Sequence, residues 1–132
     1  MGRIGLRLVA LVLACVVLLS GCSNIPASLT GNYAQDTLAL VETLRTAIEL
    51  PETDPAKSEY QAQAKLQLND FAARYRRDTT VKGLTSYTTM RTVLNAIAGH
   101  YSSYPGRPFP DKLKARITEE LNQIEVALNR GN

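Results

Sequence analysis

The chain has 132 residues, of which 45% are hydrophobic and 20% charged, with a formal net charge of +3 and two cysteines. This length fits one domain rather than two. The low net charge argues against nucleic-acid binding, which depends on many basic contacts to phosphates.

The N-terminus has the pattern of a bacterial lipoprotein signal. A basic tip carrying Arg3 and Arg7 precedes an apolar run that begins at Leu8 and closes with Leu19-Ser20-Gly21-Cys22. That closing sequence is a lipobox, in which the cysteine is acylated and becomes the first mature residue. The run is shorter than the ~20 residues that span a bilayer, which disfavours an uncut transmembrane anchor. We predict a cleaved signal peptide over residues 1–21 and lipidation of Cys22.

Cleavage before Cys22 changes the chain that remains. Of the 132 residues, 111 are left once the first 21 are removed, and the loss of two arginines lowers the formal charge from +3 to +1. No thiol is left to form a disulfide, because Cys15 is discarded and Cys22 carries lipid. Residues 22–31 are predicted as a lipidated N-terminus and tether, and residues 32–132 as one domain held together by packing.

Apolar residues recur at helical spacing in four segments after the tether. We predict helices from about Asn32 to Leu50, from Asp54-Pro55 to about Arg77, from a cap at Ser86 to about Tyr104, and from Pro110 or Asp111 to about Arg130. Their apolar faces are Leu38, Val41, Leu44 and Ile48; Tyr60, Ala64, Leu68, Phe71 and Tyr75; Met90, Val93, Leu94, Ile97 and Tyr101; and Leu113, Ile117, Leu121, Ile124 and Leu128. The pattern predicts an all-α, antiparallel up-down-up-down four-helix bundle.

Residues that could carry chemistry are sparse. His100 is the only histidine, and neither a zinc cluster nor a haem motif occurs, so we expect no metal and no cofactor. A hydrolase using Ser102 or Ser103 with His100 is the enzymatic alternative, but the motif that exposes a nucleophilic serine is missing. We therefore predict a protein that is not an enzyme.

The surface is the remaining place for a function. Acidic residues prevail in the first third of the domain and basic residues in the middle and at residues 107–116. This asymmetry has two readings, attraction between neighbouring helices or an oriented docking surface. Two clusters suit recognition, residues 74–78 and residues 100–110, because Tyr and Arg often anchor interfaces. With the rings of Tyr75 and Tyr101 expected in the core, the candidate partner-binding residues are Arg74, Arg76, Arg77, Asp78, Tyr104, Arg107 and Phe109.

These clusters also carry a family resemblance. The matching stretches include Phe71-Ala72-Ala73-Arg74-Tyr75-Arg76-Arg77-Asp78, Asp36-Thr37-Leu38, Leu44-Arg45, Thr88-Thr89-Met90, Ala98-Gly99-His100-Tyr101, Tyr104-Pro105 and Arg107-Pro108. Over essentially the whole mature chain, the sequence resembles the cyanobacterial lipoproteins of photosystem II assembly and repair, the Psb27 family.

The resemblance implies a non-catalytic, monomeric accessory factor on the lumenal side of the thylakoid membrane, anchored by the lipid on Cys22. Its implied partners are photosystem II assembly intermediates, chiefly the lumenal loop of the inner chlorophyll-binding antenna subunit, the PsbC protein. Binding would precede completion of the manganese cluster and arrival of the extrinsic subunits. The alternative is a generic envelope lipoprotein that acts as a protein-binding module.

Overall fold

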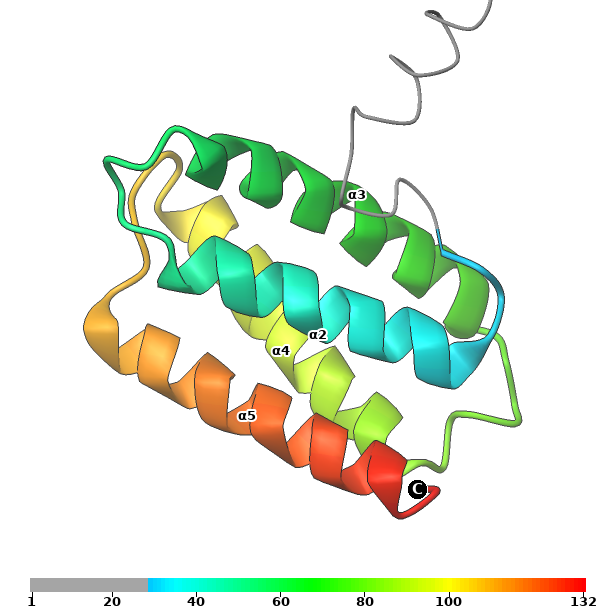
Figure 1. The fold of residues 1–132 in the computed structure, drawn as a ribbon. Helices are drawn as coiled ribbons and strands as arrows, with labels where there is room; N and C mark the ends of the chain where they lie inside the picture. Colours follow the sequence, from blue (N-terminus) through cyan, green and yellow to red (C-terminus); the bar gives the residue numbers. More distant parts are fainter. Residues whose placement is uncertain (1–28) are drawn as a thin grey trace, which may run out of the picture.

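The computed structural model describes residues 29–132, so the predicted signal peptide and Cys22 lie outside the described residues. The described chain forms four helices and no strand: α2 (Tyr33–Glu49), α3 (Ala56–Tyr75), α4 (Thr85–Ser103) and α5 (Asp111–Asn129). Successive helices run in opposite directions (Figure 1). The predicted all-α, antiparallel four-helix fold is confirmed.

Short side chains and backbone turns fix the helix ends. The Asn32 side chain caps α2 by accepting a hydrogen bond from the amide of Gln35 at 3.0 Å. Asp54 accepts one at 2.9 Å from the amide of Ala56, the first residue of α3, although the N-cap residue is Pro55 rather than the predicted Asp54. Gly131, just beyond α5, has a φ of +76°, a backbone conformation that suits glycine after a helix.

All four helices contribute to one apolar core. Phe71 lies within an aromatic group, with ring centroids 4.9 Å from Tyr75, 6.2 Å from Tyr33 and 6.3 Å from Tyr87. Each large core side chain contributes about 1.5–3 kcal/mol by leaving water. The fully buried apolar side chains are Leu40, Val41, Phe71, Met90, Val93, Ile117, Leu121 and Ile124.

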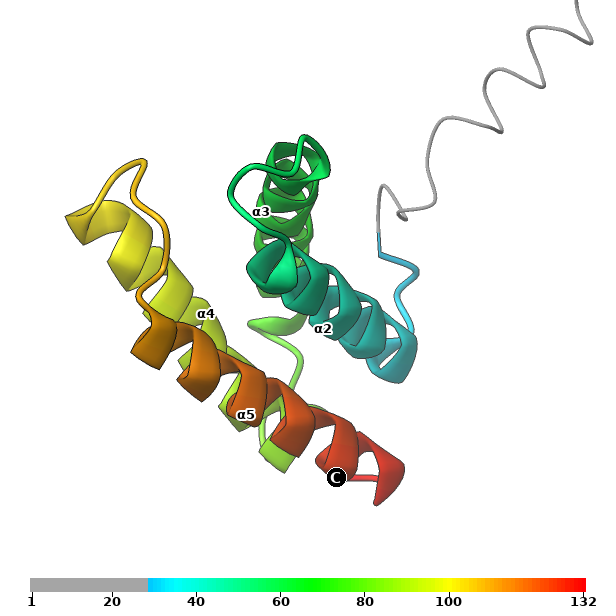
Figure 2. The same ribbon diagram turned by 60° about the vertical axis from the view of Figure 1, so that its left-hand side comes forward.

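The helices do not close evenly around this core. Helix α2 packs against both α3 and α5, and α4 packs against α5, whereas α3 and α4 make no comparable contact. The view in Figure 2 shows α3 and α4 on separate sides of the molecule. The bundle is therefore closed on three sides and open on the fourth.

Three sequence predictions about individual side chains are wrong. Ser86 does not cap a helix: α4 begins at Thr85, and the buried Ser86 hydroxyl instead hydrogen-bonds to the Tyr33 hydroxyl at 2.7 Å. Leu38 is 44% exposed, because the buried face of α2 is centred on Leu40 and residues two apart on a helix point in different directions. Tyr101 is 42% exposed because it faces the open side of the bundle.

Candidate protein-binding site

The segment that enters the domain is fixed to α2 and α3. Leu29 is buried, and its amide donates to an Asp70 carboxylate oxygen at 3.3 Å. The Asp36 carboxylate accepts from the amide and hydroxyl of Thr30 at 2.6 and 2.7 Å, and from the amide of Gly31 at 2.9 Å. The hydroxyl of Tyr75, on α3, donates to the same carboxylate at 2.5 Å. Residues 29–31, expected as the end of the tether, thus pack against the bundle.

Hydrogen bonds keep Asp36 ionised in this position. Burial by itself would raise the pKa of Asp36, but the donors on Tyr75, Thr30 and Gly31 outweigh it and hold the pKa below its ordinary value. Burial raises the pKa of Tyr75, and the hydrogen bond to the Asp36 charge raises it further. Asp36 therefore remains an acceptor and Tyr75 a donor at neutral and mildly acidic pH.

The first predicted cluster, residues 74–78, lies at the C-terminal end of α3. Arg74 and Asp78 already have partners inside the chain: Arg74 pairs with Asp70 at 3.0 Å, and Asp78 accepts from the amide and hydroxyl of Thr80 at 2.9 and 2.5 Å. The bonds from Thr80 lower the pKa of Asp78. Arg76 and Arg77 are exposed, and within residues 29–132 neither forms an ion pair. These two arginines are the better candidates for contact with a partner.

The second predicted cluster is organised around His100. This side chain is 8% exposed, its Nε2 lies 3.0 Å from the carbonyl oxygen of Arg107, and its ring centroid is 4.6 Å from that of Phe109. Tyr104 is 52% exposed and Arg107 is exposed, as predicted. Phe109 is half-buried rather than exposed, because its ring packs against His100 and Tyr101.

The same geometry bears on the enzymatic alternative. His100 is buried with its Nε2 against a backbone carbonyl, whereas Ser102 and Ser103 are exposed. The histidine–serine pair that a hydrolase would need is not formed. Within residues 29–132, no group of three or more His, Cys, Asp or Glu residues is placed to hold a metal ion. None of the four described helices is both long and apolar enough to cross a membrane.

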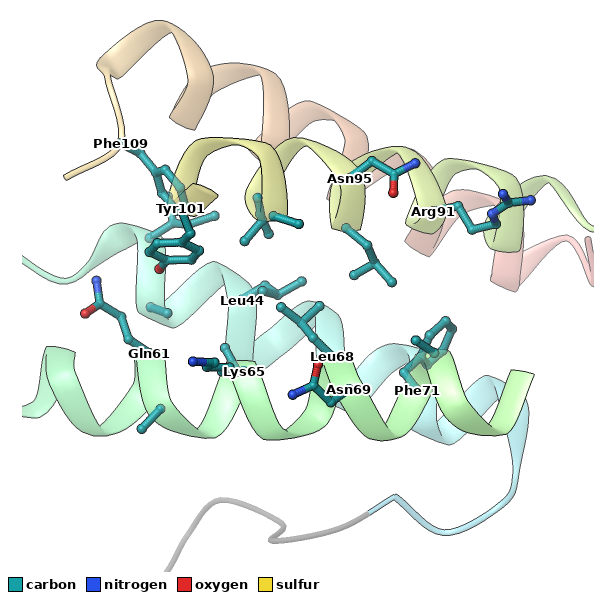
Figure 3. A pocket seen from close by; sticks show the side chains of 18 of the residues that line it. Leu44, Gln61, Lys65, Leu68, Asn69, Phe71, Arg91, Asn95, Tyr101 and Phe109 are labelled. Atoms are coloured by element: carbon teal, nitrogen blue, oxygen red, sulfur yellow. The ribbon is translucent and has the colours of Figure 1, made fainter. Parts of the chain in front are cut away.

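The two clusters lie at opposite ends of a groove between α3 and α4. Figure 3 shows side chains that line this groove. Its volume is about 1180 Å³. Arg76 and Lys82 line it at one end, and Tyr101, Gly106 and Phe109 line it at the other. The structure thus does not bring the clusters together, but one continuous surface joins them. The spacing of apolar residues predicts one apolar face for each helix, but it does not show whether another helix covers that face. The groove between α3 and α4 therefore cannot be predicted from the sequence pattern.

Comparison with known proteins identifies the family. A family model described as "Photosystem II Pbs27" matches residues 8–128. The chain belongs to this family. Among curated proteins of the Psb27 family, it is 54% identical over 130 residues to "Photosystem II assembly factor lipoprotein Psb27" of Thermosynechococcus vestitus, covering 98% of this chain and 97% of the relative. It is 48% identical over 125 residues to "Photosystem II lipoprotein Psb27" of Synechocystis sp., covering 95% of this chain and 92% of the relative.

A solved Psb27 structure has the same fold. The solution structure of Psb27 from cyanobacterial photosystem II superimposes with a TM-score of 0.73 at 48% sequence identity, over 85% of this chain and 96% of that one. The family resemblance predicted from residues 36–108 is therefore confirmed.

Proposed function

We propose that this chain is a non-catalytic accessory factor for photosystem II assembly and repair. The observation that carries the proposal is the 54% identity, over nearly the full length of both chains, to a relative named a photosystem II assembly factor. The described residues add a consistent feature: Arg76, Arg77 and Arg107 are exposed, as is the ring of Tyr104, and these residue types suit protein binding.

The proposed partner is an immature photosystem II, bound on its lumenal side through the lumenal loop of the PsbC antenna subunit. Binding would precede completion of the manganese cluster and arrival of the extrinsic subunits, and the factor would act as a monomer. Arg76, Arg77 and Arg107 support a docking role because they are exposed and unpaired within the described chain. Such side chains speed encounter with an acidic surface and fix its register.

The proposed location is the lumenal face of the thylakoid membrane, with the lipid on Cys22 as anchor. The sequence supports it through the lipobox, and both cyanobacterial relatives are named lipoproteins. A lipid anchor would confine the search for a partner to the membrane plane, leaving specificity to the protein surface.

Deletion of the gene tests this function. Cells without the protein should accumulate less assembled photosystem II and recover more slowly after light damage, and the wild-type gene should restore both. Unchanged assembly and recovery would refute the proposal. Fractionation separates it from the alternative of a generic envelope lipoprotein: enrichment with thylakoids supports the photosystem II role, whereas enrichment with the outer membrane supports the alternative.

A further inference from the structure

The groove between α3 and α4 exposes apolar side chains that a closed bundle would cover. Leu68 on α3 and Leu94 on α4 lie at core spacing in the sequence, yet both are only half-buried and both line the groove. Leu44 of α2 contributes to its floor (Figure 3). The volume of about 1180 Å³ exceeds the ~300–1,000 Å³ of most small-molecule pockets. The groove is also long, because Gln61 and Arg76 at its ends are about 22 Å apart along α3.

The charged residues that line the groove all have the same sign. They are Lys65, Arg76, Lys82 and Arg91, all exposed, and no acidic residue of the described chain joins them. Within residues 29–132 none of the four forms an ion pair. Lys65 lies on the α3 wall, whereas Arg76, Lys82 and Arg91 lie toward the end of the groove where α3 leads into α4 (Figure 3). An elongated apolar surface with basic borders is complementary to a helix that has an apolar stripe and acidic flanks.

We propose that this groove binds one amphipathic helix of a photosystem II subunit, with apolar residues on the floor and Asp or Glu residues beside the basic walls. A helix of about 15 residues would fill the length of about 22 Å. The proposal rests on the proposed function for the identity of the partner. It adds the site on this chain and the chemistry of the segment that the site accepts.

The arrangement of charge favours a helix over a lipid. An anionic lipid has one charged head group, which needs cations gathered at one end of an apolar channel. Here Lys65 lies about 16 Å from Arg76 along the α3 wall, at 1.5 Å per residue, so one cation is too far from the other three to share a single head group. A symmetric dimer that pairs two grooves is also disfavoured, because both grooves would present the same positive charge.

Photo-cross-linking at the groove tests the contact. Ala72 and Ala98 are exposed groove residues on opposite walls, and each is replaced by p-benzoyl-L-phenylalanine. Ala73, exposed beside Ala72 but outside the groove, and Val126, 48% exposed on α5, are the matched controls. The variants are mixed with photosystem II intermediates purified from cells that lack this protein. Both groove probes should cross-link to one helical, acidic and apolar peptide, and the controls should not.

Charge reversal supplies a second readout. Lys65→Glu combined with Arg91→Glu should weaken binding to the same intermediates at least about tenfold, because acidic walls would repel acidic flanks. Lys112→Glu combined with Arg130→Glu makes the same charge change on exposed positions outside the groove and should change binding less than about twofold. Circular dichroism should show the same helicity for both variants.

The outcomes separate this inference from the proposed function. If wild-type protein binds the intermediates but the groove probes give no cross-link, or the groove reversal binds like wild type, the groove inference is wrong and the proposed function stands. Cross-links from the groove probes to lipid or to a second copy of this chain also overturn it. If wild-type protein fails to bind the intermediates at all, the proposed function falls and this inference with it.

Discussion

Replacing Asp36 with asparagine should lower the free energy of unfolding by about 3 kcal/mol. Each carboxylate oxygen accepts two hydrogen bonds, one oxygen from the amide and hydroxyl of Thr30 and the other from Gly31 and Tyr75. An amide NH2 in place of either oxygen cannot accept, so the backbone amide of Thr30 or of Gly31 loses its partner, and removal of the charge weakens the bond from the buried Tyr75 hydroxyl. Each of these two losses costs about 1–3 kcal/mol. Chemical denaturation followed by circular dichroism measures the loss.

The effect of Asp36→Asn should depend on pH. The pKa of Asp36 is lower in the folded state than the ~3.9 of an unfolded aspartate. The folded state therefore binds this proton more weakly than the unfolded state. The contribution of the Asp36 carboxylate to the free energy of unfolding is complete above about pH 4, and it is lost as the pH falls through the pKa of the folded state. The difference between wild type and Asp36→Asn should thus be constant between pH 5 and 8 and shrink at lower pH.

Glu42→Gln provides the matched control for this prediction. Glu42 lies on the same helix, is exposed, and its side chain has no hydrogen bond or ion pair within the described chain. Its substitution should change stability by less than about 0.5 kcal/mol. If Asp36→Asn unfolds at the same denaturant concentration as Glu42→Gln, the hydrogen bonds of Asp36 to Thr30, Gly31 and Tyr75 do not stabilise the folded protein.

Reversing Arg76, Arg77 and Arg107 to glutamate should weaken binding to the PsbC lumenal loop at least about tenfold without unfolding the bundle. All three side chains are exposed, so the substitutions leave no buried charge. Like-charge contacts at an interface cost several kcal/mol, whereas exposed single charges contribute little to folding. Binding to isolated intermediates at two salt concentrations measures the effect, and the difference from wild type should decrease in higher salt.

The control for this triple variant is Lys112→Glu, Lys114→Glu and Arg130→Glu, which makes the same change in net charge at other positions. It should bind within about threefold of wild type. Equal binding by the triple variant and wild type, with normal helicity, would show that the docking face lies elsewhere, and the acidic residues Glu42 and Glu49 on α2 would be tested next.

Much of the fold could be predicted because its signals are local. Apolar spacing of three and four gives the helices, and Asn32, Asp54 and Gly131 mark ends through interactions within a few residues. Core positions such as Phe71 and Ile117 follow from the same spacing and are fully buried. Each of these signals lies within one helix and the residues beside it, so it can be read from a single sequence.

Features that depend on two helices could not be predicted in this way. Periodicity places Leu68 on the apolar face of α3, and Leu94 and Tyr101 on the apolar face of α4. It does not show whether another helix covers either face. The open side between α3 and α4 leaves all three partly or largely exposed. The hydrogen bond between Ser86 and Tyr33 joins residues 53 apart, and a local capping rule assigned Ser86 the wrong role.

The sequence predicts which residues could bind a partner, but it does not predict how they are arranged on the surface. Sequence alone indicated the two clusters at residues 74–78 and 100–110, and the resemblance indicated the kind of partner. The structure adds that Arg74 and Asp78 are engaged within the chain, that His100 holds the second cluster in shape, and that a groove joins the two clusters. Asp36 and Tyr75 appeared among the matching motifs without any sign that they bond to each other.

Affinity purification from solubilised thylakoids tests the central claim most directly. The wild-type protein, tagged after Asn132, is isolated together with whatever complexes it binds, and their subunits, manganese content and oxygen evolution are measured. Our account predicts that PsbC co-purifies in complexes with less manganese than mature photosystem II and without oxygen evolution. Recovery of the protein free of photosystem II subunits, or with fully loaded, oxygen-evolving complexes, would contradict it.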